Sequence, residues 1–194
     1  MPLYNSTYLK QVSRTKTLNE STRMFSEKNK THTFFDIFLS HSFLDKEDVE
    51  GLYIELTRMG FSVYVDWIID PNLDRSNVTK ATATLIREKM KSSKTLLLAI
   101  SNNASVSKWM PWELGYMDGF TSKCAIVPVS ATSSTEYSYK GFEYLSLYPF
   151  IKKIKDSNDI DKLWVIDDSQ KYVVLESWLK GTKPYQRDVN ISNL

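Results

Sequence analysis

Short apolar runs alternate with amphipathic stretches through the middle of the chain. The runs FFDIFLS (34–40), TLLLAI (95–100) and CAIVPVS (124–130) are apolar at nearly every position, and FSVYVD (61–66) is rich in β-branched and aromatic residues. Such runs predict strands buried on both faces, as in a parallel sheet. Because apolar residues at helical spacing separate them, the pattern predicts right-handed βαβ units and an α/β fold around a central parallel sheet.

The expected helices carry start and stop signals. Asp45 is the predicted N-cap of the first helix, and Gly60 is its predicted end. The second helix is expected to begin at Ser76 or Asn77, and Ser107 is expected to cap the third.

The two ends of the chain differ from the middle. Residues 1–33 are polar with sparse apolar residues, which predicts an N-terminal arm, partly helical. Residues 131–194 are expected to form an accessory C-terminal extension packed on a core of residues 34–130. Within it, LYPFIKKI (147–154) is predicted to be helical, and the segment 162–179 is predicted to form a hairpin or a strand–turn–helix unit.

Composition narrows the class of protein. The 194 residues suffice for one well-packed domain. The formal net charge of +2, from 25 basic and 23 acidic residues, lacks the basic excess of proteins that bind nucleic acids or membrane surfaces. The single cysteine, Cys124, cannot form an internal disulfide or a thiolate zinc site, so a small buried side chain is expected. Without a secretory signal or an apolar run near ~20 residues, we expect a soluble cytoplasmic protein with no nucleic-acid or membrane partner.

Polar and aromatic residues follow the ends of three predicted strands. Ligands of open parallel sheets bind at the carboxyl ends of the strands, so these side chains are expected to meet at one rim. They are Ser40, His41 and Ser42, then Asp66 and Trp67, then Ser101, Asn102 and Asn103.

A fourth group follows in SKWMPWELGYMDG (107–119). Trp109, Glu113 and Tyr116 are spaced i, i+4, i+7 and share one helix face, with Trp112 beside them. A carboxylate in such a partly apolar wall interacts strongly with a developing cation, for example a sugar oxocarbenium ion. The alternative is that both tryptophans belong to the core and that Glu113 is a solvated first-turn acid stabilised by the helix dipole.

Other common chemistries lack their motifs. The chain has no Walker A sequence, no G-x-G-x-x-G and no G-x-S-x-G. Asp66, Asp70 and Asp74 recur every fourth residue, but Pro71 interrupts them and no EF-hand pattern is present. Turn and capping roles are therefore expected for these aspartates, and no metal site is predicted.

Three segments resemble a known family. FFDIFLSHS is similar to the opening strand and loop of bacterial TIR domains, GFSVYVDWIIDPNLDRSNV to their second strand and following loop, and SKWMPWELGYMDG carries their W-x-x-x-E pattern at Trp109 and Glu113. Within residues 34–130 the matches stand in order, and they most resemble the TIR-like proteins of Thoeris antiphage defence systems.

The resemblance implies a flavodoxin-like, three-layer TIR fold and an enzyme that cleaves the nicotinamide–ribose bond of NAD⁺. The dinucleotide would be the substrate, with no separate cofactor. The product would be ADP-ribose, a cyclic isomer or a conjugate, and sequence does not choose among them. In defence systems such a product activates a separate effector protein, and TIR enzymes commonly self-associate.

The roles of individual residues follow from the same resemblance. Glu113 matches the catalytic glutamate. Phe38, Ser40 and His41 match the first-strand box that lines the pocket, and Asp66 and Trp67 match the end of the second strand. From the chemistry of their side chains, we further expect a base to stack on Trp109, Trp112 or Tyr116 and Arg75 to pair with the diphosphate.

Three other functions stay open. Some family members are non-catalytic adaptors that signal by self-association. A nucleoside N-glycosidase or a deoxyribosyltransferase could use a similar sheet. A receiver-like phospho-acceptor domain would need an acidic cluster at the end of the first strand, which FLSHS lacks.

Overall fold

The computed structural model describes residues 4–15, 33–73, 79–101, 107–130 and 143–189. The described helices are α1 (Ser6–Thr15), α3 (Lys46–Arg58), α4 (Asp66–Ile69), α5 (Lys80–Lys91), α6 (Met110–Thr121) and α7 (Leu175–Leu179), with 3-10 turns η2 (Phe43–Asp45) and η4 (Glu143–Leu147). The described strands are β1 (Tyr4–Asn5), β2 (Phe35–Ser40), β3 (Val63–Tyr64), β4 (Ser93–Ile100), β5 (Cys124–Ser130), β6 (Phe150–Lys155), β7 (Asp161–Ile166), β8 (Lys171–Val174) and β9 (Tyr185–Gln186).

One mixed sheet runs through the described residues. Its order is β3-β2-β4-β5-β6-β7-β8-β9, and β1 pairs with β5 outside this path. All pairs from β3 to β6 are parallel, and those from β6 to β9 are antiparallel. The predicted parallel α/β sheet is confirmed. Its second strand is shorter than the predicted 61–66, because Asp66 already begins the single turn of α4.

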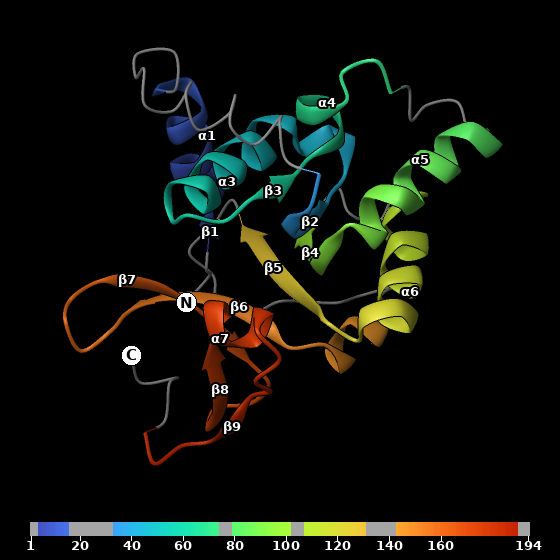
Figure 1. Ribbon diagram of the computed structural model, residues 1–194. Coiled ribbons are helices and arrows are strands. Elements are labelled where there is room, and N and C mark those ends of the chain that lie inside the picture. The colour runs from blue at the N-terminus through green and yellow to red at the C-terminus, as the bar shows by residue number, and fades with distance from the viewer. Residues whose placement is uncertain (1–3, 16–32, 74–78, 102–106, 131–142, 190–194) are drawn as a thin grey trace.

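Helices cover both faces of the sheet, which gives the three predicted layers (Figure 1). The apolar side chains of α1, α3 and α7 pack on one face, together with Ile37, Leu39 and Leu97 of the strands. Those of α5 and α6 pack on the other face, against Phe35, Leu96 and other strand residues. Consecutive strand residues point to opposite faces, so strands covered on both sides must be apolar throughout.

Residues 4–15 of the predicted arm join the core. Tyr4 pairs with Val129 of β5 in parallel register, and Leu9 of α1 has no exposed surface. Gly51 permits the close approach of α1 to α3, because a Cβ atom there would lie 2.6 Å from the carbonyl carbon of Leu9. This first described segment is therefore packed against α3, although its apolar residues are sparse.

The prediction that the segment 147–154 is helical is wrong. Its last part forms β6, which pairs with β5 at Phe150 and with β7 along its length. Ile151 is fully buried and its neighbours are half-buried. Hydrogen bonds to strands that lie elsewhere in the sequence decide the conformation here, since local propensity is a weak prior. Both predicted forms of 162–179 are present, because β7 and β8 form a hairpin and α7 follows directly.

The two predicted helix starts have different outcomes. Asp45 is the N-cap residue of α3 as predicted, but its side chain makes no capping bond, and its carboxylate accepts a hydrogen bond from Ser101. The cap of α5 is Thr79, whose hydroxyl oxygen accepts from the backbone N–H of Thr82 at 3.1 Å. Ser76 and Asn77 lie outside the described residues. Gly60 follows the end of α3 as predicted, with φ +93°, a left-handed backbone conformation that glycine adopts readily.

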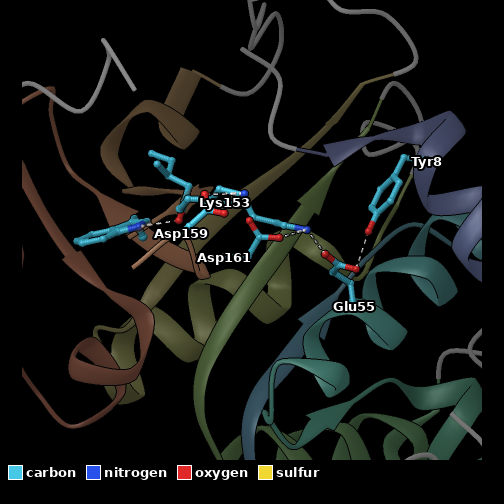
Figure 2. A network of polar contacts seen from close by, with 8 residues as sticks. Tyr8, Glu55, Lys153, Asp159 and Asp161 are labelled. Carbon is cyan, nitrogen blue, oxygen red and sulfur yellow. Dashed lines mark hydrogen bonds and ion pairs between the residues drawn. The ribbon is translucent and has the colours of Figure 1, made fainter. Parts of the chain in front are cut away.

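A charged network ties segments near the two ends of the chain to α3 (Figure 2). Glu55 of α3 is buried; it accepts a hydrogen bond from the Tyr8 hydroxyl at 2.9 Å and forms an ion pair with Lys153 of β6. Lys153 also lies 3.3 Å from a carboxylate oxygen of Asp161 in β7. Three separate parts of the sequence, namely α1, α3 and the neighbouring strands β6 and β7, thus share one set of charges. No helix among the described segments has the length and apolar character needed to cross a membrane.

Candidate active site at the carboxyl end of the sheet

The centre of the candidate site is a contact between β2 and α6. Ser40 is the last residue of β2, and its hydroxyl donates to Oε2 of Glu113 at 2.5 Å. Both residues have no exposed surface. The alternative of a solvated Glu113 is therefore wrong, because the carboxylate lies against the sheet.

Local sequence explains why Glu113 stands in the first turn of α6. The hydroxyl oxygen of Ser107 accepts from the backbone N–H of Met110 at 3.3 Å, and Pro111 follows where its missing N–H costs nothing. Acidic residues in this turn are stabilised by the helix dipole. Leu114 and Met117 anchor the helix in the core, so the Glu113 side chain is directed toward the strand ends.

His41, Trp67 and Asp66 form a second group at the same rim. His41 is buried; its Nδ1–H donates to the carbonyl of Leu39 at 2.8 Å, and its Nε2 accepts from the Trp67 indole N–H at 3.3 Å. An indole N–H can only donate, so Nε2 of His41 is the acceptor in this contact. Asp66 lies 3.5 Å from the same nitrogen and accepts the backbone N–H of Trp67 at 2.7 Å.

Aromatic rings line the flank of α6. The ring centres of Trp109 and Trp112 are 5.5 Å apart, those of Trp112 and Tyr116 are 6.1 Å apart, and those of Tyr116 and Phe120 are 6.2 Å apart. Trp112 is 37% exposed and Phe120 is 52% exposed, so the alternative that Trp112 belongs to the core is wrong. These rings offer a surface on which a flat base can stack.

Two predicted site residues have different outcomes. Phe38 is buried in the core, stacked on Tyr64 with 5.2 Å between ring centres. Arg75 lies outside the described residues. Asp70 has a structural role: it accepts from the Tyr64 hydroxyl at 2.9 Å and pairs with Lys89 at 3.2 Å.

Lys46 is a neighbour of the site that sequence reasoning missed. Its ammonium group lies 4.8 Å from the centre of the Trp67 ring and 5.7 Å from that of Phe43. A cation over an aromatic face is stabilising and restrains both groups. No spacing rule could find this contact, because it requires α4 to fold back against the start of α3.

Two groups near α6 titrate far from neutral pH. Burial raises the pKa of the Cys124 thiol to about 12, so this residue is a protonated, buried side chain as predicted. Burial, together with the hydrogen bond to Asp118, raises the pKa of Tyr148 to about 12. Its hydroxyl donates to Asp118 at 3.0 Å and joins η4 to α6.

A hollow of about 600 Å³ opens beside α4, between residues 69–73 and the start of α5. Its polar lining includes Asp70, Asn72, Thr79 and Thr82. The volume lies in the range typical of small-ligand sites.

Together these groups suit one kind of chemistry. A carboxylate held out of water offsets positive charge more strongly than one in bulk solvent. Neighbouring rings favour a flat, uncharged or cationic heterocycle. Because Glu113 is fully covered, a ligand can reach it only when the groups above it move aside.

Comparisons with known proteins identify the family of this chain. The sequence model of the TIR domain family matches residues 37–163. A protein of Bacillus cereus (strain MSX-D12), named "Probable 3' cyclic ADP-D-ribose synthase ThsB'", is 49% identical over 155 residues, which are 79% of this chain and 78% of the relative. A protein of Cytobacillus dafuensis, named "Putative cyclic ADP-D-ribose synthase TIR2", is 26% identical over 95 residues, which are 48% of this chain and 25% of that protein.

Among solved structures, the TIR domain of the Toll-related receptor TRR-2 of Hydra magnipapillata is similar with a TM-score of 0.39. The sequence identity is 17%, and the match covers 56% of this chain and 80% of that one.

Proposed function

Because this chain belongs to the TIR domain family, we propose that it is an NAD⁺-consuming enzyme that cleaves the nicotinamide–ribose bond and closes the product into a cyclic ADP-ribose. The observation that carries the proposal is the buried Glu113 carboxylate at the carboxyl end of the parallel sheet. The name of the Bacillus cereus relative supports the choice of a cyclic product over free ADP-ribose.

The chemistry needs little beyond charge and orientation. When the bond between the ribose carbon and the nicotinamide nitrogen breaks, its electron pair neutralises the pyridinium ring, so no general acid is required. The ribose carbon is left with oxocarbenium character. Glu113 offsets this charge and accepts hydrogen bonds from ribose hydroxyls, and such charge-assisted bonds are roughly twice as strong as neutral ones.

The nucleophile decides the product. In a cyclic product, the ribose carbon is attacked by another group of the same molecule while nicotinamide leaves. A hydroxyl that attacks releases its proton to solvent, whereas a base nitrogen attacks through its lone pair. We favour a ribose 3′-hydroxyl, by analogy with the relative's name. Trp67, Trp109, Trp112 and Tyr116 would hold the bases so that the two ends of the dinucleotide meet.

The direct test is to incubate the purified protein with NAD⁺ and separate the products by chromatography. Wild type should release nicotinamide and a cyclic ADP-ribose, and Glu113→Gln should lower the rate about 100-fold or more, as loss of one charge-stabilising group does. Glu47→Gln is the matched control, since Glu47 is exposed and pairs with Arg14 of α1. Equal rates in wild type and Glu113→Gln would exclude Glu113 as the catalytic residue.

One observation favours a second candidate, a non-catalytic adaptor. Glu113 has no exposed surface, so it cannot touch a ligand without rearrangement. An adaptor would signal unchanged after Glu113→Ala and would leave NAD⁺ intact, whereas the enzyme would lose both signalling and turnover.

We also propose that the product activates a separate effector protein in defence against phage, the role that the Thoeris resemblance implies. Self-association is expected to accompany activity, because contact with a second copy can move the groups that cover Glu113. Light scattering of the assay samples, with and without NAD⁺, measures the oligomeric state. Full activity in a strict monomer would contradict the proposed self-association.

A further inference from the structure

Ser40 and Glu113 meet although 73 residues separate them in sequence. The strand places the serine at the rim, and the first turn of α6 brings the carboxylate to it. The two oxygens lie 2.5 Å apart, so the serine hydroxyl donates directly to the carboxylate.

This contact changes the role expected for Ser40. A serine hydroxyl has one proton to donate, and here Glu113 receives it. Donation from Ser40 to a phosphate oxygen would require the hydroxyl to leave the carboxylate.

We propose that Ser40 is a positioning residue that fixes the Glu113 carboxylate for catalysis and does not bind the substrate itself. The inference rests on the proposed function. Glutamate has several rotatable bonds, and a buried carboxylate with one donor fewer will turn toward other partners. Misplacement of a catalytic group by about 1 Å is enough to lower a rate about 100-fold.

The place of Ser40 at the end of a strand suits a positioning role. Ser40 is the last residue of β2, where it still pairs with Leu98 of the neighbouring strand β4. A donor on a strand is placed more accurately than one on a loop. The carboxylate thus takes its orientation from the sheet rather than from α6 alone.

The test is steady-state turnover of NAD⁺ by Ser40→Ala, Ser40→Cys and wild type. Ser40→Ala should lower kcat about 10- to 100-fold, with KM within about twofold of wild type because no substrate contact is lost. Ser40→Cys, which keeps a weak donor of similar size, should recover part of kcat. Ser93→Ala is the matched control: this buried strand serine donates to the Lys89 carbonyl at 2.8 Å at the other end of β4, and its loss should leave both constants unchanged.

The outcomes separate this inference from the proposed function. If the wild-type protein releases no nicotinamide from NAD⁺, the proposed function itself is wrong. An active wild type with an unchanged kcat in Ser40→Ala, or with a raised KM alone, overturns the positioning role. If Ser40→Ala does not fold, as circular dichroism would show, Ser40→Cys decides by the same two constants.

Discussion

At the scale of single residues, the rim of the sheet is organised by hydrogen bonds between neighbours in space. Ser40 and His41 are adjacent in sequence, yet the first holds Glu113 of α6 and the second holds Trp67 of α4. The end of β2 therefore holds side chains from both α6 and α4 at the candidate site. His41 is a buried link between the Leu39 carbonyl and the Trp67 indole, which is a structural role.

Replacing His41 tests this role. In His41→Leu the Trp67 indole N–H and the Leu39 carbonyl lose their partner, and we expect the free energy of unfolding to fall by about 1–3 kcal/mol, the cost of buried polar groups left unpaired. His41→Gln, which retains an acceptor, should lose less. Urea denaturation measures both; equal losses would show that packing, and not the hydrogen bond to Trp67, is what His41 supplies.

At the scale of elements, the docking of α1 depends on the absence of a side chain at Gly51. The carbonyl carbon and Cα of Leu9 lie 2.6 and 2.8 Å from the place where a Cβ would stand. These are backbone atoms, which cannot move aside as the end of a flexible side chain can. The two helices therefore touch through their main chains, and α1 must shift if the glycine is replaced.

Gly51→Ala and Gly119→Ala should act in opposite directions. We expect Gly51→Ala to lower the free energy of unfolding by about 1–3 kcal/mol, as overpacking does. A Cβ at Gly119 in α6 would have no atom within 4 Å, so alanine there should raise stability by up to about 1 kcal/mol through helix propensity. Thermal unfolding compares them; a stabilised Gly51→Ala would mean that α1 is not packed on α3 in solution.

At the scale of the whole molecule, the network around Glu55 joins α1, α3, β6 and β7 (Figure 2). Burial alone would lower the pKa of Lys153, but the hydrogen bond and charge of Glu55 outweigh it and leave the pKa above its usual value. Burial also raises the pKa of Tyr8. Groups whose pKa is raised by folding stabilise the fold below their ordinary pKa, and this contribution is lost as the pH rises through the folded value.

The free energy of unfolding should therefore fall above a pH of about 10, and all described segments should unfold in one transition. Lys153→Met should reduce this loss and should cost about 2 kcal/mol at a pH of about 8, because Glu55 stays buried without its cation. Lys155→Met is the control: its exposed pair with Asp159 should contribute less than about 1 kcal/mol. Denaturant titrations from neutral to strongly alkaline pH give both values, and equal effects of the two substitutions would contradict the linkage of the distant segments through Lys153.

The amino-acid sequence by itself determined the central strands and the start of α6. Strands covered on both faces are apolar at nearly every residue, so their positions follow from the local sequence. The start of α6 is local as well, because Ser107 and Pro111 are residues that favour the beginning of a helix. The same holds for the spacing that puts Glu113 in the first turn beside Trp109 and Tyr116.

Only the tertiary structure decided which side chains meet. The strand β6 instead of a helix, the place of Tyr4 beside β5, and the contacts of Ser40 with Glu113 and of His41 with Trp67 all join segments that are distant in sequence. Hydrogen bonds across a sheet are made with whichever strand lies alongside, and that neighbour is set by chain topology. The pattern of apolar residues along the chain therefore predicts which faces of a helix or strand are buried. It does not predict which other element covers each face.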